Sequence, residues 1–405
     1  MAQRRVAVTG LGAISALGHD VPSFWNALCA GRPAIARIES VDLTNVRFQN
    51  GAEVRGYDPA QHFESAQADL LDRFAQFALI AARQAIQDSG IVFTPELRQR
   101  TAIVTGSSVG GQNSQDAQFW AVYRQNSPRV HPLTIPRIMP NAGASHISME
   151  FGISGPAFTV STACASSNHA LGQAFWMVRS GAAELAIAGG SETPFSFGFL
   201  KAWEAMRVVA PDTCRPFSRD RRGLILGEGA AMLVLEPLDS ARARGALVYA
   251  EIAGFGMSSD AGHITTPSTD GPARAMQAAL LDADLSPEAI AYINAHGTGT
   301  TNNDCTETRA IRQVFGAHAD KLAVSSTKSM HGHALGAASA LEAVATVLAL
   351  RHATLPPTAN YTTPDPECDL DVVPNESRSA EVEYALSNAF AFGGLNAVLA
   401  FRQGL

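Results

Sequence analysis

The stretch AFTVSTACASSNHALG, residues 157–172, passes from a strand pattern into a helix pattern within a few residues. The β-prone run AFTV comes first, and apolar residues then recur at helical spacing: Leu171, Ala174, Phe175 and Val178. Cys164 therefore lies at or near the start of the helix. The free N–H groups and positive end of a helix stabilise a thiolate or a developing oxyanion, which predicts a thiol pKa below the usual ~8.5. A cysteine that only fills space is the alternative.

A similar pattern recurs later in the chain. VSTACASSNHALG (160–172) aligns without a gap on VSSTKSMHGHALG (324–336), an offset of 164 residues. The strand-like runs GAAMLVL (229–235) and LNAVLAF (395–401) match at an offset of 166. Similar offsets favour an internal duplication. Because β-rich runs that end at glycines alternate with helical periods, we predict a mixed α/β protein with two similar halves, residues 1–253 and 254–405.

The composition fits a large folded chain. Of 405 residues, 46% are hydrophobic and 17% are charged, which disfavours a disordered chain or a small disulfide-stapled module. The five cysteines are scattered without zinc or redox spacing, so we expect reduced thiols and a cytoplasmic protein. No apolar run approaches the ~20 residues that a membrane helix needs.

The charge distribution limits the partners. A net charge of −7 provides no positive field for nucleic acid or an anionic membrane, and we expect neither as a partner. Basic residues gather between Lys201 and Arg222, where six basic and three acidic side chains give a local charge of +3. A solvated charged face and a docking patch for an acidic partner remain equal interpretations.

A second candidate site follows another predicted strand. In YINAHGTGT, residues 292–300, His296 stands where the strand breaks into a glycine-rich turn, with the hydroxyls of Thr298 and Thr300 beside it. Loops of this kind often carry functional side chains, although a structural histidine is an equal alternative. Asp304 and Glu307 have the spacing of a helix cap, and we expect them to be structural.

The third candidate is SSTKSMHGH, residues 325–333, which contains Lys328, His331 and His333. No acidic or cysteine ligand nearby completes a zinc set, so we predict no metal. Glu342 lies nine residues after His333, and a straight helix would point these two side chains apart. A glutamate within an apolar stripe nevertheless needs a partner.

A fourth segment, NAFAFGGLN at residues 388–396, is a glycine-bearing loop before the last predicted strand. Its N–H groups are candidates for binding a ligand, and Phe390 and Phe392 are candidates for covering an apolar channel. A plain β-turn beside a buried aromatic residue is the alternative.

Two other glycine patterns suggest different functions. GLGAIS, residues 10–15, lacks the third glycine of a dinucleotide-binding fingerprint. GSSVG, residues 106–110, does fit the nucleophile elbow of α/β-hydrolases, with Ser108 as the nucleophile and Asp304 and His333 following in the expected order. This serine acyl-hydrolase hypothesis leaves the cysteine and lysine motifs without roles.

The motifs resemble a known set. TAC (162–164), NAHGTGT (294–300), TKSMHGH (327–333) and FGG (392–394) occur in the order found in the β-ketoacyl-[acyl-carrier-protein] synthases of the II type. The resemblance covers nearly the whole chain. It implies a thiolase-like fold, in which two duplicated α/β halves form a layered αβαβα sandwich, and a homodimer, with a heterodimer as the alternative.

The resemblance also implies the reaction, a decarboxylative Claisen condensation in fatty-acid synthesis or in specialised acyl or polyketide synthesis. The enzyme would need no cofactor of its own, because acyl carrier protein brings the 4′-phosphopantetheine arm. Cys164 would carry the acyl chain as a thioester, and its N–H and that of Phe392 would form the oxyanion hole. His296 and His333 would hold the malonyl carbonyl as negative charge develops on its oxygen.

Further positions follow from the same resemblance. Lys328 and Glu342 would orient groups or act electrostatically, and Thr298 and Thr300 would contact the pantetheine arm. Phe390, Ala391 and Phe392 would form the gate, and the acyl tunnel would lie near Val109 and Phe195. The basic stretch would dock the carrier protein through Arg207, Arg219, Arg221 and Arg222.

The chain departs from the family pattern at several positions. Ala391 replaces a hinge glycine and Leu395 a threonine, so we expect the gate to open differently. The segments AWEAMR (202–207) and APDTCRPF (210–217) are similar to those of nodulation E-type ketosynthases, which leaves a specialised pathway open. A non-catalytic chain-length partner subunit is a third hypothesis, but such subunits typically lack the nucleophile.

Overall fold

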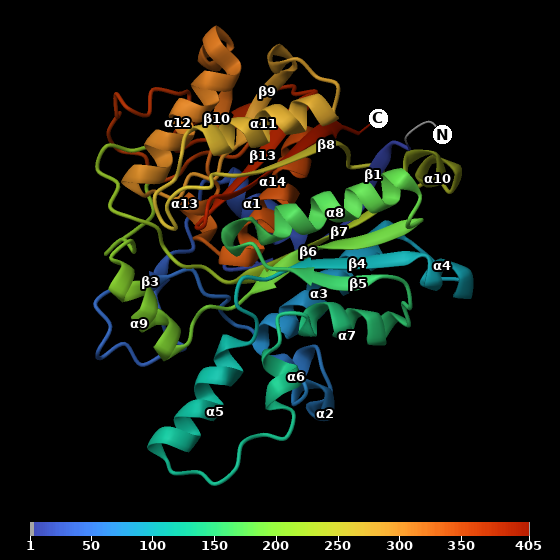
Figure 1. The fold of residues 1–405 in the computed structure, drawn as a ribbon, viewed down its shortest axis with the longest axis vertical. Helices are drawn as coiled ribbons and strands as arrows, with labels where there is room; N and C mark the ends of the chain where they lie inside the picture. The colour runs from blue at the N-terminus through green and yellow to red at the C-terminus, as the bar shows by residue number, and fades with distance from the viewer. Residues whose placement is uncertain (1–3, 405) are drawn as a thin grey trace.

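The computed structural model describes residues 4–404 and arranges them in five layers, helix, sheet, helix, sheet and helix (Figure 1). Ten strands form one continuous hydrogen-bonded sheet in the order β10-β9-β13-β14-β8-β1-β7-β6-β4-β5. The first half of the chain supplies β1 (Val6–Ser15), β4 (Thr101–Gly106), β5 (Ala157–Val160), β6 (Leu185–Glu192) and β7 (Gly229–Pro237). The second half supplies β8 (Ala250–Ser259), β9 (Ile290–Asn294), β10 (Ala323–Ser325), β13 (Tyr384–Ala391) and β14 (Leu395–Gln403).

Both halves use the same strand order. Counted outward from the junction, β1, β7, β6, β4 and β5 of the first half correspond to β8, β14, β13, β9 and β10 of the second. The halves join where β1 pairs antiparallel with β8 over Val6–Val8. This repeated order confirms the predicted duplication. The predicted division at residues 253 and 254 falls inside β8, so the junction between the halves precedes Ala250.

The sequence match between the halves is right for the strands and wrong for the helices. β7 and β14 contain nine residues each and start 166 residues apart, as predicted. The helix after β5 is α8 (Ser166–Ser180), preceded by the 3₁₀ turn η2 (Ala163–Ala165). Its counterpart is α14 (Ala338–His352), preceded by η5 (Leu335–Ala337). The second half therefore inserts extra residues before its helix, and these include α13 (Lys328–His331).

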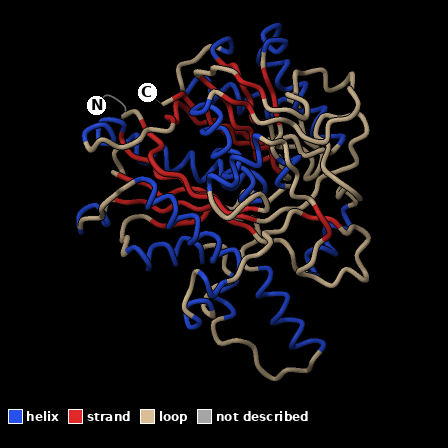
Figure 2. The backbone as a smooth tube through the Cα atoms, turned by 180° about the vertical axis from the view of Figure 1, so that it is seen from behind, coloured by secondary structure: helices blue, strands red, loops and turns tan. Residues whose placement is uncertain are grey.

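The helices cover both faces of each half-sheet. The central layer is α8 and α14, which contact strands of both halves and each other. The outer layer of the first half contains α3 (Arg73–Ser89) and α7 (Ala142–Phe151), and that of the second contains α11 (Asp270–Asp282) and α12 (Thr301–Phe315). The tube view from behind shows the same arrangement (Figure 2).

Alternating side chains of each strand serve two different cores, as the period of two along a strand requires. Leu233 and Leu235 of β7 face the central core, whereas Met232 and Val234 face the outer core under α3. In the second half, Leu399 of β14 faces the central core and Val398 the core under α11 and α12. The strands β1, β4, β6 and β7 are therefore buried along their whole length.

The remaining elements lie around this framework. They are the helices α1 (Val21–Cys29), α2 (Ser65–Ala68), α4 (Pro95–Gln99), α5 (Gln112–Arg124), α6 (Thr134–Ile138), α9 (Phe197–Met206) and α10 (Leu238–Ala243), the 3₁₀ turns η1 (Pro59–Gln61), η3 (Pro287–Ala289) and η4 (Gly316–Lys321), and the short strand pairs β2 (Ala36–Arg37) with β3 (Asn50–Gly51) and β11 (Thr354–Leu355) with β12 (Arg378–Ser379). α5 and the loop after it project from the body of the molecule (Figure 1). Within residues 4–404, no helix combines the length and apolarity needed to cross a membrane.

Candidate active site

Cys164 lies in a sharp turn between β5 and α8, in the middle of the 3₁₀ turn η2. Ala163 adopts a left-handed conformation with φ of 49°, which turns the chain before the sulfur. The backbone of Gly106 packs closely under this turn, because a Cβ there would lie 2.5 Å from the carbonyl carbon of Ser166. The turn places Cys164 at the beginning of the helix, as predicted.

The thiol of Cys164 is more deeply buried than the sequence suggests. Its residue is 6% exposed, and burial raises the pKa of the thiol to about 11. Lys328 and backbone hydrogen bonds from Phe392 and from Cys164 itself lower that pKa, but burial is the larger effect. The prediction of a lowered thiol pKa was therefore wrong for the unacylated protein, because spacing along a helix does not reveal the depth of a side chain.

His296 follows β9 in a tight turn that a buried carboxylate braces. Glu307 of α12 accepts hydrogen bonds from the backbone N–H groups of His296 and Gly297, both at 2.8 Å. Gly297 has φ of 37°, and a Cβ at this position would lie 2.5 Å from the Cβ of Ser326. The expectation that Glu307 is structural is consistent with these contacts, since the carboxylate holds the turn that presents His296.

Lys328 connects this turn to the inserted segment of the second half. Its ammonium donates hydrogen bonds to the backbone oxygen of His296 at 2.6 Å and to its Nδ1 at 3.3 Å. It also forms an ion pair with Glu342, and both side chains are at most 1% exposed. The buried Glu342 thus has the partner that its position required. It does not follow His333 along one straight helix, because η5 precedes α14.

The hydrogen bonds assign the protons of both active-site histidines. His296 Nδ1 accepts from Lys328, and His333 Nδ1 accepts from the N–H of Leu335 at 3.2 Å. Burial, together with the nearby Lys328, holds the pKa of both imidazoles well below the usual value, so both rings are neutral. A neutral ring whose Nδ1 accepts carries its proton on Nε2. Each ring therefore has one N–H to donate.

Cys164 and these two histidines face one another. A sulfur or ring-nitrogen atom from each lies within 4.8 Å of the others, and the two imidazole planes cross at 83° with centroids 5.5 Å apart. His331 points elsewhere, since its Nε2 lies 2.9 Å from Thr327 Oγ1 and its ring packs near Phe24. The nucleophile motif and the two histidine motifs, distant in sequence, thus form one cluster.

The cluster lies in a cavity of about 280 Å³ that extends to the protein surface. Of the predicted residues, the cavity is lined by Cys164, His296, His333, Thr298, Thr300, Phe390, Ala391, Phe392, Arg207 and Arg222. Arg207 and Arg222 are exposed. Val109 and Phe195 do not belong to this lining, although Phe195 and Phe392 share a separate apolar cluster.

One predicted docking residue is not available at the surface. The side chain of Arg221 is 2% exposed and forms ion pairs with Asp304 and Asp365. Its inclusion in a docking patch was wrong, because a guanidinium held by two carboxylates inside the protein cannot meet a partner. Arg219 is exposed but is not part of the cavity lining.

The glycine-bearing loop is the tight turn between β13 and β14. Gly393 and Gly394 have φ of 84° and 69°, and a Cβ on Gly394 would lie 2.5 Å from the Cβ of Asp260. Both glycines are therefore needed for the turn. Ala391 is the last residue of β13, where extended backbone suits an alanine. The ring of Phe392 lies 6.3 Å from that of Trp203 at the cavity wall.

The hydrolase hypothesis lacks the required geometry. Ser108 Oγ has no hydrogen-bond partner among the described residues, and Asp304 instead accepts from the N–H groups of Phe217 and Gly299. A serine nucleophile needs a base in contact and an acid that orients the base. Ser108, His333 and Asp304 form no such chain of contacts.

Sequence reasoning missed Glu192, which connects the halves beside the site. Its carboxylate accepts hydrogen bonds from the N–H of Ser108 at 2.5 Å, from Ser107 Oγ at 3.0 Å and from the N–H of Gly336 at 3.1 Å. Burial raises its pKa to about 7. The only sequence signal was an acidic residue at the end of an apolar strand.

The chain is similar to known proteins along nearly its whole length. Residues 3–241 match the family model "Beta-ketoacyl synthase, N-terminal domain" and residues 249–362 match "Beta-ketoacyl synthase, C-terminal domain". The chain is 49% identical to nodulation protein E of Rhizobium sp. (strain N33), over 99% of each chain. It is 42% identical to 3-oxoacyl-[acyl-carrier-protein] synthase 2 of Synechocystis sp. (strain ATCC 27184 / PCC 6803 / Kazusa), over 99% of this chain and 98% of the relative.

A solved structure extends the likeness to three dimensions. A ketosynthase in complex with its type II PKS acyl-carrier protein superposes with a TM-score of 0.90 at 32% identity, over 99% of this chain and 100% of that one. This similarity confirms the thiolase-like fold. The non-catalytic chain-length subunit is not favoured. The chain belongs to the β-ketoacyl synthase family and is a condensing enzyme of the acyltransferase type.

Proposed function

We propose that Cys164 is the nucleophile and that His296 and His333 are the two donors for the malonyl thioester. The observation that carries this assignment is that the sulfur lies within 4.8 Å of a ring nitrogen of each of two neutral imidazoles, inside a cavity that reaches the surface. Two neutral imidazoles that each present an N–H group can stabilise an oxygen that gains negative charge. They are less suited to act as bases, because Nε2 already carries a proton.

In the first half-reaction, the sulfur of Cys164 attacks the acyl thioester carried on the phosphopantetheine arm. The oxyanion forms within reach of the N–H groups of Cys164 and Phe392, whose hydrogen bonds already act on the sulfur. Collapse of this intermediate breaks the bond to the carrier sulfur, which receives the proton that Cys164 loses. The high pKa of the thiol favours a transfer in which deprotonation accompanies attack.

In the second half-reaction, the malonyl carboxylate leaves as carbon dioxide, and its bonding electrons form an enolate. The Nε2–H groups of His296 and His333 donate to the enolate oxygen. The enolate carbon then attacks the acyl carbonyl, the bond to Cys164 breaks, and 3-oxoacyl carrier protein forms. Stabilising this charge in the transition state, rather than in the bound substrate, accelerates the step.

Lys328 acts as a positioning residue through His296. Its hydrogen bonds to the backbone oxygen and Nδ1 of His296 fix both the turn and the tautomer. Glu342 balances the ammonium charge where water does not reach it, because both side chains are buried.

The exposed Arg207 and Arg222 at the cavity mouth are the proposed docking residues for the acidic carrier protein. Thr298 and Thr300 also line the cavity and would contact the pantetheine arm. An electrostatic contact of this kind weakens as salt increases.

A second copy of the chain is the proposed partner of the open edge of the sheet. β10, one edge strand, is buried and bridges to Asp371, whereas β5, the other edge, is partly exposed and includes Phe158 at 38% exposure. Elsewhere on the surface, the projecting α5 exposes the apolar residues Phe119, Trp120 and Tyr123. An uncovered edge that carries an exposed apolar side chain favours strand pairing. Analytical ultracentrifugation should give a dimer, and Phe158→Asp should give a monomer; a monomeric unaltered protein would contradict the proposal.

A two-step labelling experiment tests the assignment. Acyl carrier protein with a saturated chain is added alone, and the trapped acyl group is located by peptide mass spectrometry. We expect it on Cys164, and malonyl carrier protein should then release it as 3-oxoacyl carrier protein. An acyl group found on Ser108, or one on Cys164 that malonyl carrier protein does not discharge, would refute the mechanism. The five free cysteines also lead us to propose a reducing, cytoplasmic location.

A further inference from the structure

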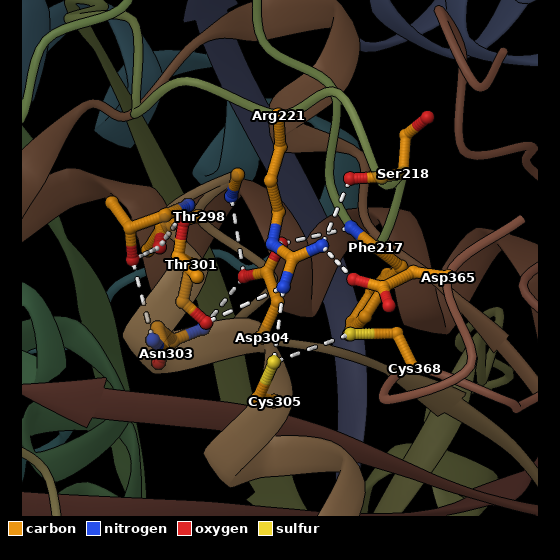
Figure 3. Close-up of polar contacts among 12 residues, drawn as sticks. Phe217, Ser218, Arg221, Thr298, Thr301, Asn303, Asp304, Cys305, Asp365 and Cys368 are labelled. Carbon is orange, nitrogen blue, oxygen red and sulfur yellow. Dashed lines mark hydrogen bonds and ion pairs between the residues drawn. The ribbon is translucent and has the colours of Figure 1, made fainter. Parts of the chain in front are cut away.

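Two cysteines that the reaction does not use lie side by side in the second half (Figure 3). Cys305 is near the start of α12, and Cys368 is in the loop between β11 and β12. Their sulfur atoms are 3.9 Å apart, with 6% exposure of Cys305 and 2% of Cys368. The loop above them is at the surface, since Pro366 and Glu367 are exposed. The pair is therefore one layer of residues below solvent.

Arg221 makes the two sulfurs chemically different. Its Nη2 donates to the sulfur of Cys305 at 3.0 Å, and its Nη1 donates to Asp365 at 2.5 Å (Figure 3). The thiol of Cys368 donates to the sulfur of Cys305 from another direction. Cys305 accepts from a guanidinium and from a thiol, and its own thiol donates to Glu367 at the longer distance of 3.8 Å. The two acceptor contacts favour the thiolate on Cys305 and place Cys368 to react next.

A bound metal ion fits this cluster poorly. Ligand atoms of Cys305, Asp365 and Cys368 all lie within 4.8 Å of one another, as the ligands of a metal would. The guanidinium of Arg221 already binds two of the three, however, and its positive charge opposes a cation at the same place. Charge therefore favours oxidation chemistry over metal binding.

We propose that Cys305 and Cys368 form a reversible oxidation site that a peroxide converts to a disulfide. The sulfur of Cys305 attacks one peroxide oxygen, the O–O bond breaks, and the site holds a sulfenic acid while hydroxide leaves. The sulfur of Cys368 then attacks the oxidised sulfur, the S–O bond breaks, and the Cys368 proton leaves with the oxygen as water. The net change is two thiols and hydrogen peroxide to one disulfide and two waters.

The surrounding contacts determine which side must move. The sulfurs need to approach from 3.9 Å to about 2.05 Å. α12 is held by the Thr300 cap and by the bonds from Glu307 to the His296 turn. Ion pairs of Asp365 with Arg221 and of Asp369 with Arg312 hold the loop on either side of Cys368. The residues between them, Pro366 and Glu367, are exposed, so we expect this short segment to move. The disulfide would leave His296 in place.

Oxidation should accelerate with pH. Burial raises the pKa of both thiols, and Arg221 offsets part of that rise. Glu367 and Asp365 oppose the Cys305 thiolate, and Asp304 opposes that of Cys368. Because the thiolate is the reacting form, we expect faster closure at pH 8.5 than at pH 7.

Peptide mass spectrometry of the unaltered protein tests the proposal. Reduced folded protein is treated with graded hydrogen peroxide, alkylated under denaturing conditions and digested with trypsin. Trypsin places Cys305 in peptide 275–309 and Cys368 in peptide 352–378. We expect these two peptides to be joined in most chains, two hydrogens lighter than their sum, and separated again by dithiothreitol.

Matched cysteines provide the controls. Cys214 is 1% exposed, but its sulfur contacts the backbone oxygen of Thr298, and it should stay reduced. Cys305→Ser should abolish the link, and Cys368→Ser should allow Cys305 to continue to the sulfinic acid. The proposal fails if no link forms at a peroxide dose that oxidises Cys29 or Cys164, or if zinc binds one per chain and protects both thiols from alkylation. The readout does not depend on condensing activity.

Discussion

The turn before α8 and the turn before α14 have closely similar backbones but different contents. Each begins with a residue in the left-handed region, Ala163 at φ 49° and Leu335 at φ 47°, and each leads through three 3₁₀ residues into a helix of 15 residues. The middle residue of the first turn is Cys164, which lines the cavity. The middle residue of the second is Gly336, where a Cβ would lie 2.4 Å from the N of Ser108. The duplicated turn thus offers a sulfur in one half and close packing in the other.

The connections around the two turns also differ. In the second half, the extra residues before η5 supply Lys328 and His333. In the first half, residues 193–228 connect β6 to β7 and carry α9 and the basic stretch, whereas the equivalent β13–β14 connection is the short turn 392–394. Insertions at different places in one repeated frame therefore divide the roles in the proposed mechanism. The nucleophile and the carrier-docking residues come from one half, and the enolate donors and the gate come from the other.

Replacing the sulfur tests the difference between the turns most severely. Cys164→Ala should lower the rate of condensation by about 10⁴-fold or more, because no thioester can form. Steady-state formation of 3-oxoacyl carrier protein measures the loss. The variant should keep its fold and still decarboxylate malonyl carrier protein, since the histidines remain. Undiminished condensation would remove Cys164 from the mechanism.

Removing one donor of the second half should have the next largest effect. His333→Leu deletes one N–H and should slow condensation by about 10²–10³-fold. His333→Gln is the matched variant, because an amide N–H can replace part of the donation, and it should lose less. Acylation of Cys164 by acyl carrier protein, measured separately by mass spectrometry, should be nearly unchanged in both. Equal losses in both half-reactions would contradict the division between the halves.

Adding a methyl group to the second turn should destabilise the fold. Gly336→Ala places a Cβ 2.4 Å from the N of Ser108 and 2.6 Å from Glu192 Oε2, and neither neighbour is free to move away. We expect a loss of about 1–3 kcal/mol in the free energy of unfolding, measured with urea. The equivalent residue change in the first turn, Cys164→Ala, is the control and should change stability less. Similar losses at both positions would show that the two turns are packed alike.

The sequence predicted the repeated frame and the four motifs because these depend on local pattern. Strand and helix periods identified the strands, the helix after Cys164 and the strand end at His296. The helix of the second half was misaligned, since a gapless comparison cannot show an insertion between a strand and its helix. The sequence showed that Glu342 needs a partner, but it did not show that the partner is Lys328. That pairing depends on the η5 turn, which redirects the chain before α14.

Burial was the property that the sequence concealed. Arg221 and Arg222 are neighbours in a basic run, but Arg221 is inside the protein with two carboxylates and Arg222 is at the cavity mouth. Cys164 and Glu192 have pKa values raised by depth rather than set by their spacing. Proximity of Cys305 to Cys368 likewise depends on where a loop folds back on α12.

The pH dependence of Cys164 alkylation tests how strongly burial raises the pKa of its thiol. With a pKa of about 11, only a small fraction of Cys164 is thiolate near neutrality. Alkylation by iodoacetamide should therefore increase about tenfold for each pH unit between 7 and 9, followed by mass spectrometry of the Cys164 peptide. A rate that levels off in this range would show that the helix end lowers the pKa more strongly than burial raises it.

The smallest expected effect concerns the long connection that only the first half possesses. Arg222→Glu places a negative charge at the cavity mouth without touching the cluster around Cys164, so it should raise the KM for acyl carrier protein severalfold and leave kcat nearly unchanged. Arg242→Glu, at an exposed arginine of α10, is the control for a change in net charge and should have little effect. The difference between the two variants should shrink as salt rises, because the Debye length falls from about 10 Å at 0.1 M to about 3 Å at 1 M. If kcat falls instead while KM is unchanged, Arg222 acts on the reaction rather than on docking, and the long connection of the first half belongs to the catalytic machinery.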